Sequence, residues 1–470
     1  MAIAANPGFN LTPSSTQQAL ASNYITNFDF LSQYLPDTYE KEFERYGNRS
    51  VSSFLRMVGA EMPSNSDLIK WAEQGRLHTK YVNCSSGAAA TSDTATITIA
   101  DTAVANIGDQ AIRVGQTVYI YDNAGGGSNK GIVTAVNSTT AKAFDVAYYE
   151  GGGQNFGTSE TLSVFVYGSE FRKGTEGMVG SLEADDQIFE CSPIIIKDKY
   201  AVSGSDMAQI GWVEVTTENG ATGYLWYLKS EHETRLRFDD YLETAMLEAV
   251  PAETGSGAIA AAVGAKGTDG IFHVVKNRGN LWSGANPSTL TNFDTIVQRL
   301  DKQGAIEENV LFVDREFSFD IDDMLATQNS YGGGGTSYGL FDNDKDMALN
   351  LGFSGFRRGY DFYKSDWKYL NDPTMRGDMS TQAGSGRING LLVPAGSTTV
   401  YDQVLGKNAK RPFLHVRYRA SESEDRRYKT WITGSAGGAM NSSLDAMEVH
   451  FLSERACCTM GANNFFLFEQ

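Results

Sequence analysis

Residues 84–165 carry the pattern that most constrains how this 470-residue chain can fold. Short runs rich in Val, Ile, Tyr, Phe and Thr recur there, and clusters of Gly, Asn, Asp or Ser separate them. Such runs favour strands, and such clusters favour turns. We therefore expect a small antiparallel barrel or sandwich that is inserted into the chain. Its strands are predicted at Thr94–Ile99, Thr117–Tyr121, Gly131–Val136, Phe144–Tyr149 and Leu162–Tyr167.

The composition is that of a folded protein with many turns. The chain holds 49 Gly but only 10 Pro, which excludes collagen and proline-rich linkers. Its 25 Phe, 22 Tyr and 6 Trp supply more apolar burial than a disordered chain offers. The net charge of −18 repels phosphate backbones on average, so we expect no dedicated DNA-binding role.

The sequence predicts neither a secretory signal nor a membrane helix. The first basic residue is Lys41, so the N-terminus lacks the positive segment of a signal peptide. No run approaches the roughly 18 apolar residues of a membrane helix. The cysteines are Cys84, Cys191, Cys457 and Cys458 and show no C-x-x-C spacing. We expect reduced thiols in a cytosolic setting rather than a zinc site.

The segments on either side of the inserted domain predict different structures. Residues 1–35 are polar and lack a helical or strand period, which indicates an extended arm. From Tyr39 to Lys80 the pattern turns helical in pieces, and Ser66 is placed to cap a helix over Asp67–Gln74. Residues 168–225 combine glycines with strand-like runs, and this pattern predicts an extended hairpin that projects from a body.

The clearest helical pattern follows that hairpin. Ser230 and Glu233 match a capping box, Pro251 ends the helix, and a start as early as Gly223 is also possible. One apolar stripe runs through Phe238, Leu242, Ala245 and Ala249. Further elements are predicted as a helix over Thr291–Gln303 ended by Gly304, a strand over Val310–Val313, a short helix over Asp320–Ala326, and strands over Leu414–Tyr418 and Met447–Phe451.

Two motifs that could indicate enzymatic chemistry lack the context that the chemistry needs. Ser337 stands in a G-x-S-x-G match, but four glycines precede this match where a nucleophile elbow requires a buried strand. His232 and Glu233 begin like a zincin motif, yet no second His follows one turn later. We expect a loop hinge at Ser337 and no zinc site on the helix, and a serine hydrolase remains the weakest alternative for the whole protein.

Two further motifs resemble ligand-binding loops only in part. Asp342, Asp344 and Asp346 alternate like the start of a calcium loop, but Met347 and Phe353 occupy the positions that need Gly and Glu. The segment 264–270 lacks the G-K-[ST] spacing of a phosphate-binding loop. We therefore predict no catalytic residue, no cofactor-binding residue and no metal ligand, and no cofactor.

Residues 356–369 and 411–431 interleave basic and aromatic side chains. Such stretches can stack on single-stranded nucleic acid. Acidic residues are mixed into both of them, and aromatic residues and Arg also dominate protein–protein contacts. The pattern favours a subunit interface over a nucleic-acid platform.

The element order resembles that of the major capsid protein of tailed bacteriophages, the Hong Kong 97 type. Val166–Thr175 resembles the start of the family's E-loop, and Asp186–Phe189 with Asp198–Gly204 resembles its return strand. The helix ending at Val250 resembles the spine helix, and Thr291–Val313 a helix and strand of the axial domain. Leu444–Ala456 and Ala462–Phe468 resemble closing strands of the peripheral domain. Length and character are also similar to capsid proteins of crAss-like and related podophages.

The resemblance implies an α+β fold with an inserted β-domain. The expected parts are an N-terminal arm with short helices over 1–83, the inserted domain over 84–165, an E-loop over 166–222, a peripheral domain over 223–278, an axial domain over 279–410, and a return to the peripheral domain over 411–470.

The resemblance also implies a structural role rather than an enzyme. Such subunits form hexamers and pentamers of an icosahedral head around double-stranded DNA, which they do not bind by sequence. It further implies scaffold, portal and decoration proteins as partners, no membrane, a place in the virion, and assembly in the cytoplasm of the bacterial host. Another virion component, from the tail or the capsid decoration, is the alternative.

Overall fold

A computed structural model describes the chain from Ala60 onward with several gaps. The chain divides into the units Met1–Arg49 and Ser50–Gln470, and all described residues belong to the second. The predicted arm and the first helical pieces lie outside the described residues. These residues are 60–87, 92–100, 110–137, 142–152, 156–180, 186–208, 214–216, 222–261, 265–330, 354–377, 379, 386–402, 407–438 and 440–470.

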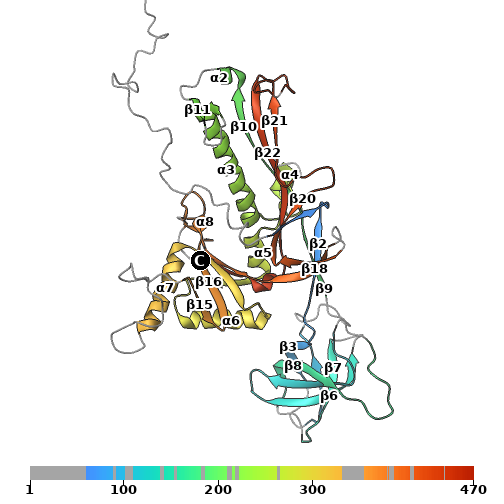
Figure 1. Cartoon of the computed structure of the whole chain (residues 1–470). Helices are drawn as coiled ribbons and strands as arrows, with labels where there is room; N and C mark the ends of the chain where they lie inside the picture. The colour runs from blue at the N-terminus through green and yellow to red at the C-terminus, as the bar shows by residue number, and fades with distance from the viewer. Residues whose placement is uncertain are drawn as a thin grey trace, which may run out of the picture. The chain divides into compact units, whose positions relative to one another are not determined.

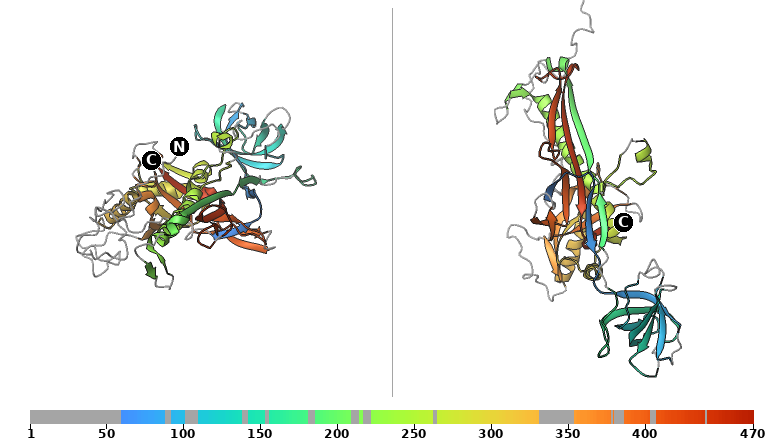
Figure 2. Two further views of the ribbon diagram at one scale, coloured as in Figure 1. Left: turned by 90° about the horizontal axis from the view of Figure 1, so that it is seen from above. Right: turned by 90° about the vertical axis from the view of Figure 1, so that its right-hand side faces the viewer.

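A five-stranded sheet is built around the long strand β22 (Ala446–Thr459). Three strands pair antiparallel with β22, and β1 joins the sheet by parallel pairing with β20. Figures 1 and 2 show the helix α3 (Leu225–Glu248) alongside β10 and β22. The other strands are β1 (Ala60–Ser64), β10 (Ile194–Ser203), β20 (Leu414–Arg419) and β21 (Lys429–Gly434).

The helix α3 packs its predicted stripe on this sheet. Phe238 and Leu242 are buried with three side chains of β22, namely Met447, Val449 and Phe451. The predicted capping box is wrong, because Ser230 lies inside the helix, where its carbonyl accepts a 2.9 Å hydrogen bond from the Thr234 hydroxyl. The earlier start that the sequence left open lies two residues from the observed one.

A mixed six-stranded sheet forms the second body of the fold, in the order β13-β23-β17-β14-β16-β15. Helix α6 (Leu290–Gln303) begins one residue before the predicted start, where the Thr289 hydroxyl accepts from the Asn292 N–H. It ends as predicted, because Gly304 adopts the left-handed conformation with a φ of 66°. The predicted strand lies within β14 (Glu308–Val313), and the predicted short helix lies within the longer α7 (Arg315–Ser330).

The last strand of the chain corrects one expectation. Residues 462–468 were expected to close the peripheral domain, but β23 lies inside the six-stranded sheet, between β13 and β17. The chain therefore leaves the five-stranded sheet after β22 and enters the second sheet through a short 3-10 turn, η1 (Ala462–Asn464). The remaining elements of this sheet region are α5 (Ile271–Arg278), β13 (Asn280–Ser283), β15 (Gly355–Arg358), β16 (Tyr360–Asp366), α8 (Lys368–Asn371), β17 (Ile388–Pro394) and β23 (Phe466–Glu469).

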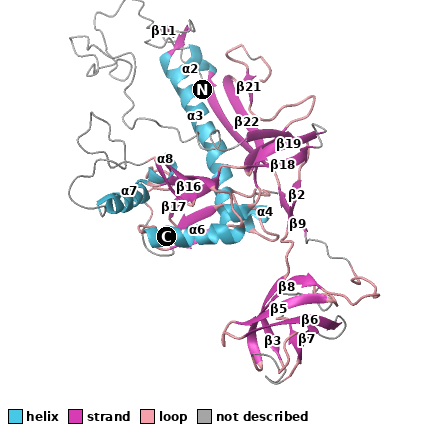
Figure 3. Cartoon of the chain, turned by 60° about the horizontal axis from the view of Figure 1, so that its bottom comes forward, coloured by secondary structure: helices cyan, strands magenta, loops and turns pink. Residues whose placement is uncertain are grey.

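The predicted β-domain is a closed six-stranded barrel in the order β3-β4-β7-β6-β5-β8. Its described residues form strands and loops only (Figure 3). All five expected strands are present, and the sixth is β3, which the sequence analysis missed. Inward side chains such as Ile97, Val118 and Phe144 fill the barrel. The strands are β3 (Lys80–Ser86), β4 (Thr94–Thr98), β5 (Gln116–Asp122), β6 (Ser128–Asn137), β7 (Ala143–Tyr148) and β8 (Ser159–Ser169).

A two-stranded ribbon leads the chain into the barrel and back. Strand β2 (Ile69–Gln74) precedes the barrel, and β9 (Asp186–Cys191) follows it and pairs antiparallel with β2. The predicted helix over 67–74 is therefore wrong, because long-range pairing with β9 overrides a weak local preference. The hydroxyl of Ser66 instead accepts from the N–H of Leu68 in a tight turn.

The predicted hairpin within 168–225 is also corrected, because its strands take partners elsewhere in the chain. Strand β9 pairs with β2, and β10 pairs with β22. The described part of 168–225 contains only one small hairpin, β11 (Glu214–Thr216) with β12 (Thr222–Tyr224).

Three small elements complete the fold: the hairpin of β18 (Ser397–Asp402) and β19 (Lys407–Pro412), the helix α2 (Gly204–Ala208) and the helix α4 (Gly257–Ala261). Within the described part of the chain, each helix is too short or too polar to cross a membrane.

We expect Phe238→Ala to destabilise the contact between α3 and the five-stranded sheet. The ring is fully buried, with its centroid 5.7 Å from that of Phe451, so its loss leaves a cavity. The free energy of unfolding should fall by about 3–5 kcal/mol, measured by chemical denaturation. The matched control is Phe319→Ala on α7, because this ring is 57% exposed and its removal should cost far less. Equal losses in the two variants would contradict the packing described here.

Candidate assembly interface

The ribbon of β2 and β9 is held against the body by a half-buried arginine. Arg278, at the end of α5, places its guanidinium carbon 3.9 Å from the ring centroid of Phe189 and 5.9 Å from that of Trp71. One ring comes from each strand, so a single cation contacts both strands. Burial lowers the pKa of Arg278, and the nearby carboxylates of Glu73 and Asp269 oppose this shift.

A carboxylate of the ribbon provides the second attachment. One oxygen of Glu73 accepts hydrogen bonds from the Trp71 indole N–H and from the backbone N–H of Gly461, each at 2.9 Å. Gly461 stands between β22 and η1, so this contact joins the ribbon to the body. Around it, Ile69 and Trp71 pack against a small apolar cluster of Cys191, Ala456 and Cys458.

The opposite face of the ribbon presents apolar side chains to solvent. Ile188 is 69% exposed in the middle of β9, and Leu68 is exposed just before β2. Between them Lys70 and Glu190 form a 3.0 Å ion pair across the two strands. Contiguous apolar surface rimmed by polar residues is typical of interaction sites. The outer face of the ribbon is therefore the first candidate contact surface.

A shallow apolar groove of about 520 Å³ between α3 and β10 is the second candidate. Tyr241 is 46% exposed at its wall, and Val250 is exposed just beyond the end of α3. A groove of this kind fits an extended segment or a side chain of a partner. Its lining consists of Ile196, Tyr241, Thr244, Ala245, Glu248 and Ala249.

The barrel carries exposed aromatic rings on adjacent strands. Phe165 and Tyr167 of β8 lie on its outer face with ring centroids 6.4 Å apart, and both are at least 40% exposed. Strand β5 is paired with β8 and adds the exposed ring of Tyr121. Lys130 of the next strand lies 5.9 Å from the ring of Tyr167. Aromatic residues are enriched in protein interfaces, so this outer face is the third candidate.

Polar contacts at the end of α3 connect the helix of the five-stranded sheet to the region of the six-stranded sheet. Arg376 donates two hydrogen bonds to the carboxylate of Glu248, the last residue of α3, and a third, of 2.9 Å, to the carbonyl of Gly386. The hydroxyl of Tyr369 donates to the same carboxylate at 2.5 Å. Burial raises the pKa of Tyr369, so this hydroxyl remains a donor at neutral pH.

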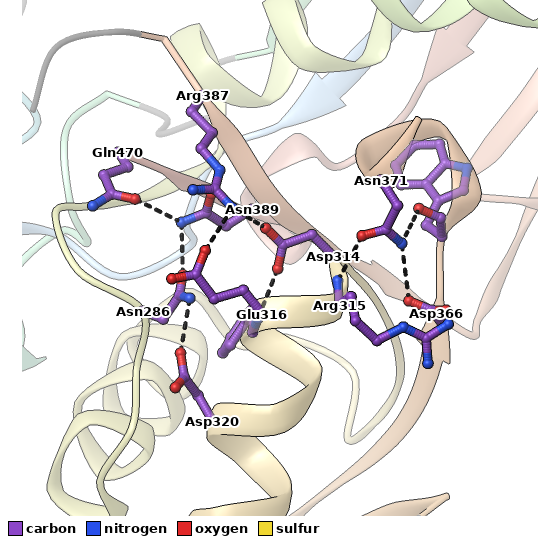
Figure 4. A network of polar contacts seen from close by, with 12 residues as sticks. Asn286, Asp314, Arg315, Glu316, Asp320, Asp366, Asn371, Arg387, Asn389 and Gln470 are labelled. Carbon is purple, nitrogen blue, oxygen red and sulfur yellow. Dashed lines mark hydrogen bonds and ion pairs between the residues drawn. The ribbon is translucent and has the colours of Figure 1, made fainter. Parts of the chain in front are cut away.

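A polar network fixes the start of α7 against the six-stranded sheet (Figure 4). Asp314 accepts from the Phe317 N–H at 2.7 Å and caps α7. Arg387 donates to Asp314 at 2.8 Å and to Glu316 at 2.7 Å. Burial raises the pKa of Asp314, and the Phe317 N–H and Arg387 oppose this shift by stabilising the carboxylate.

The same network continues through side-chain amides and reaches the end of the chain (Figure 4). Asn389 of β17 donates to Asn286 at 2.6 Å and to Gln470 at 3.4 Å, and Asn286 donates to Asp320 at 2.8 Å. On the other side of Asp314, the Asn371 side chain accepts from the Arg315 N–H at 2.8 Å and donates to Asp366. These contacts attach the start of α7 and the side chain of Gln470 to the six-stranded sheet.

The two basic–aromatic stretches pair many of their cations with nearby carboxylates. In the first stretch Arg357 lies 3.1 Å from Asp361, Arg358 contacts Asp294, and Lys364 contacts Asp322. In the second stretch three arginines are paired, namely Arg419 and Arg426 with Glu454, and Arg427 with Glu61. Paired charges offer little to a phosphate backbone, which favours the interface interpretation of these stretches.

The motifs considered from the sequence are distributed as follows. Ser337 and the aspartates at 342, 344 and 346 lie outside the described residues. His232 and Glu233 lie on α3, and no group of metal-binding side chains is found in the parts of the chain that the structure describes. Gly267 lies in a turn with a φ of 67°, close to the backbone of Val250. Its role there is to permit that close approach.

The ribbon surfaces were missed in the sequence analysis for a physical reason. The strand of β2 alternates half-buried and exposed positions through Ile69, Trp71 and Glu73, and this period of two was the available signal. The partner strand lies more than a hundred residues later, beyond the barrel, so no local pattern connects the two.

Comparison with known proteins finds similarity at the level of structure alone. No family model matches the chain, and no curated protein matches it. A solved chain from Mycobacterium phage Ogopogo aligns with a TM-score of 0.41 and 8% identity, covering 95% of this chain and 99% of that one. A chain from Microbacterium phage Oxtober96 gives 0.40 and 8%, covering 94% and 97%. The capsid of an empty GTA particle gives 0.39 and 8%, covering 96% and 99%.

We expect Arg278→Met to loosen the ribbon without unfolding the barrel. The variant keeps most of the length of the side chain but removes the cation over the two rings, a contact that is worth about 0.5–2 kcal/mol. Amide hydrogen exchange should accelerate several-fold in 69–74 and 186–191 and stay unchanged in the barrel. The matched control is Arg299→Met, because Arg299 lies over Trp282 at 5.8 Å in another part of the fold. Unchanged exchange in the ribbon would contradict the anchoring role of Arg278.

Proposed function

We propose that the chain is the major capsid protein of a tailed bacteriophage. In this proposal, copies associate into hexamers and pentamers that build an icosahedral head of the Hong Kong 97 type around double-stranded DNA. The observation that carries the proposal is the two-faced ribbon. Its inner face is fastened to the body through Arg278 and Glu73, while its outer face leaves Ile188 uncovered.

A ribbon of this kind favours self-assembly because a neighbouring copy can cover what the chain itself leaves exposed. Three separate surfaces, on the ribbon, the α3 groove and the barrel, carry exposed apolar groups. A closed shell repeats each contact by symmetry, so small individual contacts add up over many neighbours. The glycines of 174–180 support bending between different shell positions, since Gly174 and Gly180 adopt backbone conformations that other residues rarely reach.

The proposal assigns the parts of the family fold to this chain. The ribbon of β2 and β9 takes the place of the E-loop, with the barrel inserted between its two strands, rather than residues 166–222. The helix α3 takes the place of the spine helix, with the peripheral domain formed around it by residues 223–278 and most of 411–470. Residues 279–410, with β23 added, take the place of the axial domain, and 1–83 contain the arm.

The charge distribution supports a container for DNA rather than a DNA-binding protein. The net charge is −18, and the cations of the two basic–aromatic stretches are largely paired. An acidic wall lets DNA pack without adhering to it. The proposal places the protein in the virion after assembly in the cytoplasm of the bacterial host. Scaffold, portal and decoration proteins are its expected partners, in addition to itself.

Electron microscopy of the purified protein tests the proposal directly. We expect closed shells or rings of five and six subunits, on their own or with a co-expressed scaffold protein. A protein that stays monomeric at high concentration, with and without scaffold, would contradict a shell role. A tail component would instead form tubes or single rings of another symmetry.

We expect Ile188→Asp to block assembly while leaving the fold intact. Ile188 is 69% exposed, so the carboxylate costs little in the isolated chain, but it would be buried in a subunit contact. Shell yield in sedimentation should fall by at least tenfold, with unchanged circular dichroism and melting temperature. The control is Met440→Asp, which adds the same charge at an apolar side chain that is 88% exposed and lies outside the three candidate surfaces. Normal shells from Ile188→Asp would exclude the ribbon face as a contact surface.

A further inference from the structure

Two of the four cysteines lie next to each other at the base of the ribbon. The sulfur of Cys191, at the end of β9, is 3.3 Å from the sulfur of Cys458 in β22. The two residues are 267 positions apart in the sequence, and both are at most 3% exposed. All four cysteines are free in this structure, which describes the thiol form. The contact therefore results from tertiary packing rather than from local sequence.

Packing around the pair selects one partner for each sulfur. The apolar side chains of Ile69, Trp71 and Ala456 pack with the two thiols, which hydrogen-bond to each other. Asp269 and Arg417 are charged groups that also act on Cys191. Cys457 is adjacent to Cys458 but belongs to a different apolar cluster, because neighbouring strand residues point to opposite faces. Cys84 is buried inside the barrel. Neither of these two can compete for Cys191 while the protein is folded.

We propose that Cys191 and Cys458 form a disulfide when the protein passes from reducing to oxidising conditions. A disulfide requires a sulfur–sulfur distance of about 2.05 Å, so the two sulfurs must approach by roughly 1.2 Å. The bond would fasten the last residue of β9 to the central strand β22. The Arg278 and Glu73 contacts would then be joined by a covalent one on the same side of the ribbon.

The reaction balances with a small-molecule disulfide as the oxidant. The thiolate of one cysteine attacks the oxidant, which forms a mixed disulfide and releases one small thiol. The second cysteine displaces the other half, so one protein sulfur–sulfur bond forms and two small thiols carry away both protons. The protein sulfurs are oxidised and the small disulfide is reduced.

Burial determines when this exchange can occur. The hydrogen bond between the two thiols and their desolvation raise the pKa of Cys191, so the thiolate is scarce in the folded state. Exchange therefore requires the ribbon base to open or the chain to refold. Once formed, the bond is shielded from reductants by the same burial. If the proposed function holds, shells released from the reducing host cytoplasm are where this form accumulates.

The experiment is disulfide mapping of the full-length protein after refolding. The denatured protein is refolded in a buffer of reduced and oxidised glutathione, free thiols are alkylated, and the digest is analysed without reduction. We expect one major cross-linked peptide that joins Cys191 to Cys458, with Cys84 and Cys457 alkylated. Alkylated Cys191 under oxidising conditions, or a link from Cys191 to Cys457, would overturn the proposal. Neither outcome depends on whether shells form.

Variants separate the disulfide from general effects of oxidation. In the wild type, oxidation should raise the melting temperature by several degrees and slow proteolysis within 69–74 and 186–191. Cys191→Ser and Cys458→Ser should each abolish this rise in melting temperature. If Cys191→Ser does not fold, Cys191→Ala is used in its place. The matched control Cys84→Ser should retain the full gain. A gain that survives in Cys191→Ala would overturn the proposal.

Discussion

The burial of β22 is the interaction on which the rest of the structure depends. This 14-residue strand is buried almost throughout its second half, and it pairs with β10, β20 and β21. Its apolar residues Met447, Val449 and Phe451 receive α3. Its end leads through η1 into β23 of the six-stranded sheet and contacts the base of the ribbon at Cys458. One strand thus positions the helix, the second sheet and the ribbon.

The ribbon of β2 and β9 has one face attached to the body and one face exposed to solvent. On its inner side, Arg278, Glu73 and the cysteine pair hold both strands. On its outer side, Ile188 remains exposed, and the barrel is inserted between the two strands. Attachment on one side and exposed apolar surface on the other are the two features on which the proposed assembly rests. The proposed capsid role follows from this division rather than from any catalytic arrangement.

Elements with a complete local signal were predicted well. The barrel strands alternate and end at turn residues, and α6 has both its cap at Thr289 and its stop at Gly304. Elements whose partners lie far away were not. The segment 67–74 was predicted as a helix because its capping serine is local, whereas its true partner, β9, follows the barrel. The hairpin within 168–225 failed in the same way, because β10 pairs with β22 near the end of the chain.

The strand periods of the barrel and the apolar stripe of α3 can be read from the local sequence, and so can the excess of acidic residues that disfavours binding to DNA. Which strands pair, which rings Arg278 contacts and which two of the four cysteines meet are properties of the folded chain. The physical reason is that turn and helix preferences act over a few residues. Strand pairing and burial instead depend on surfaces that exist only after distant segments have come together.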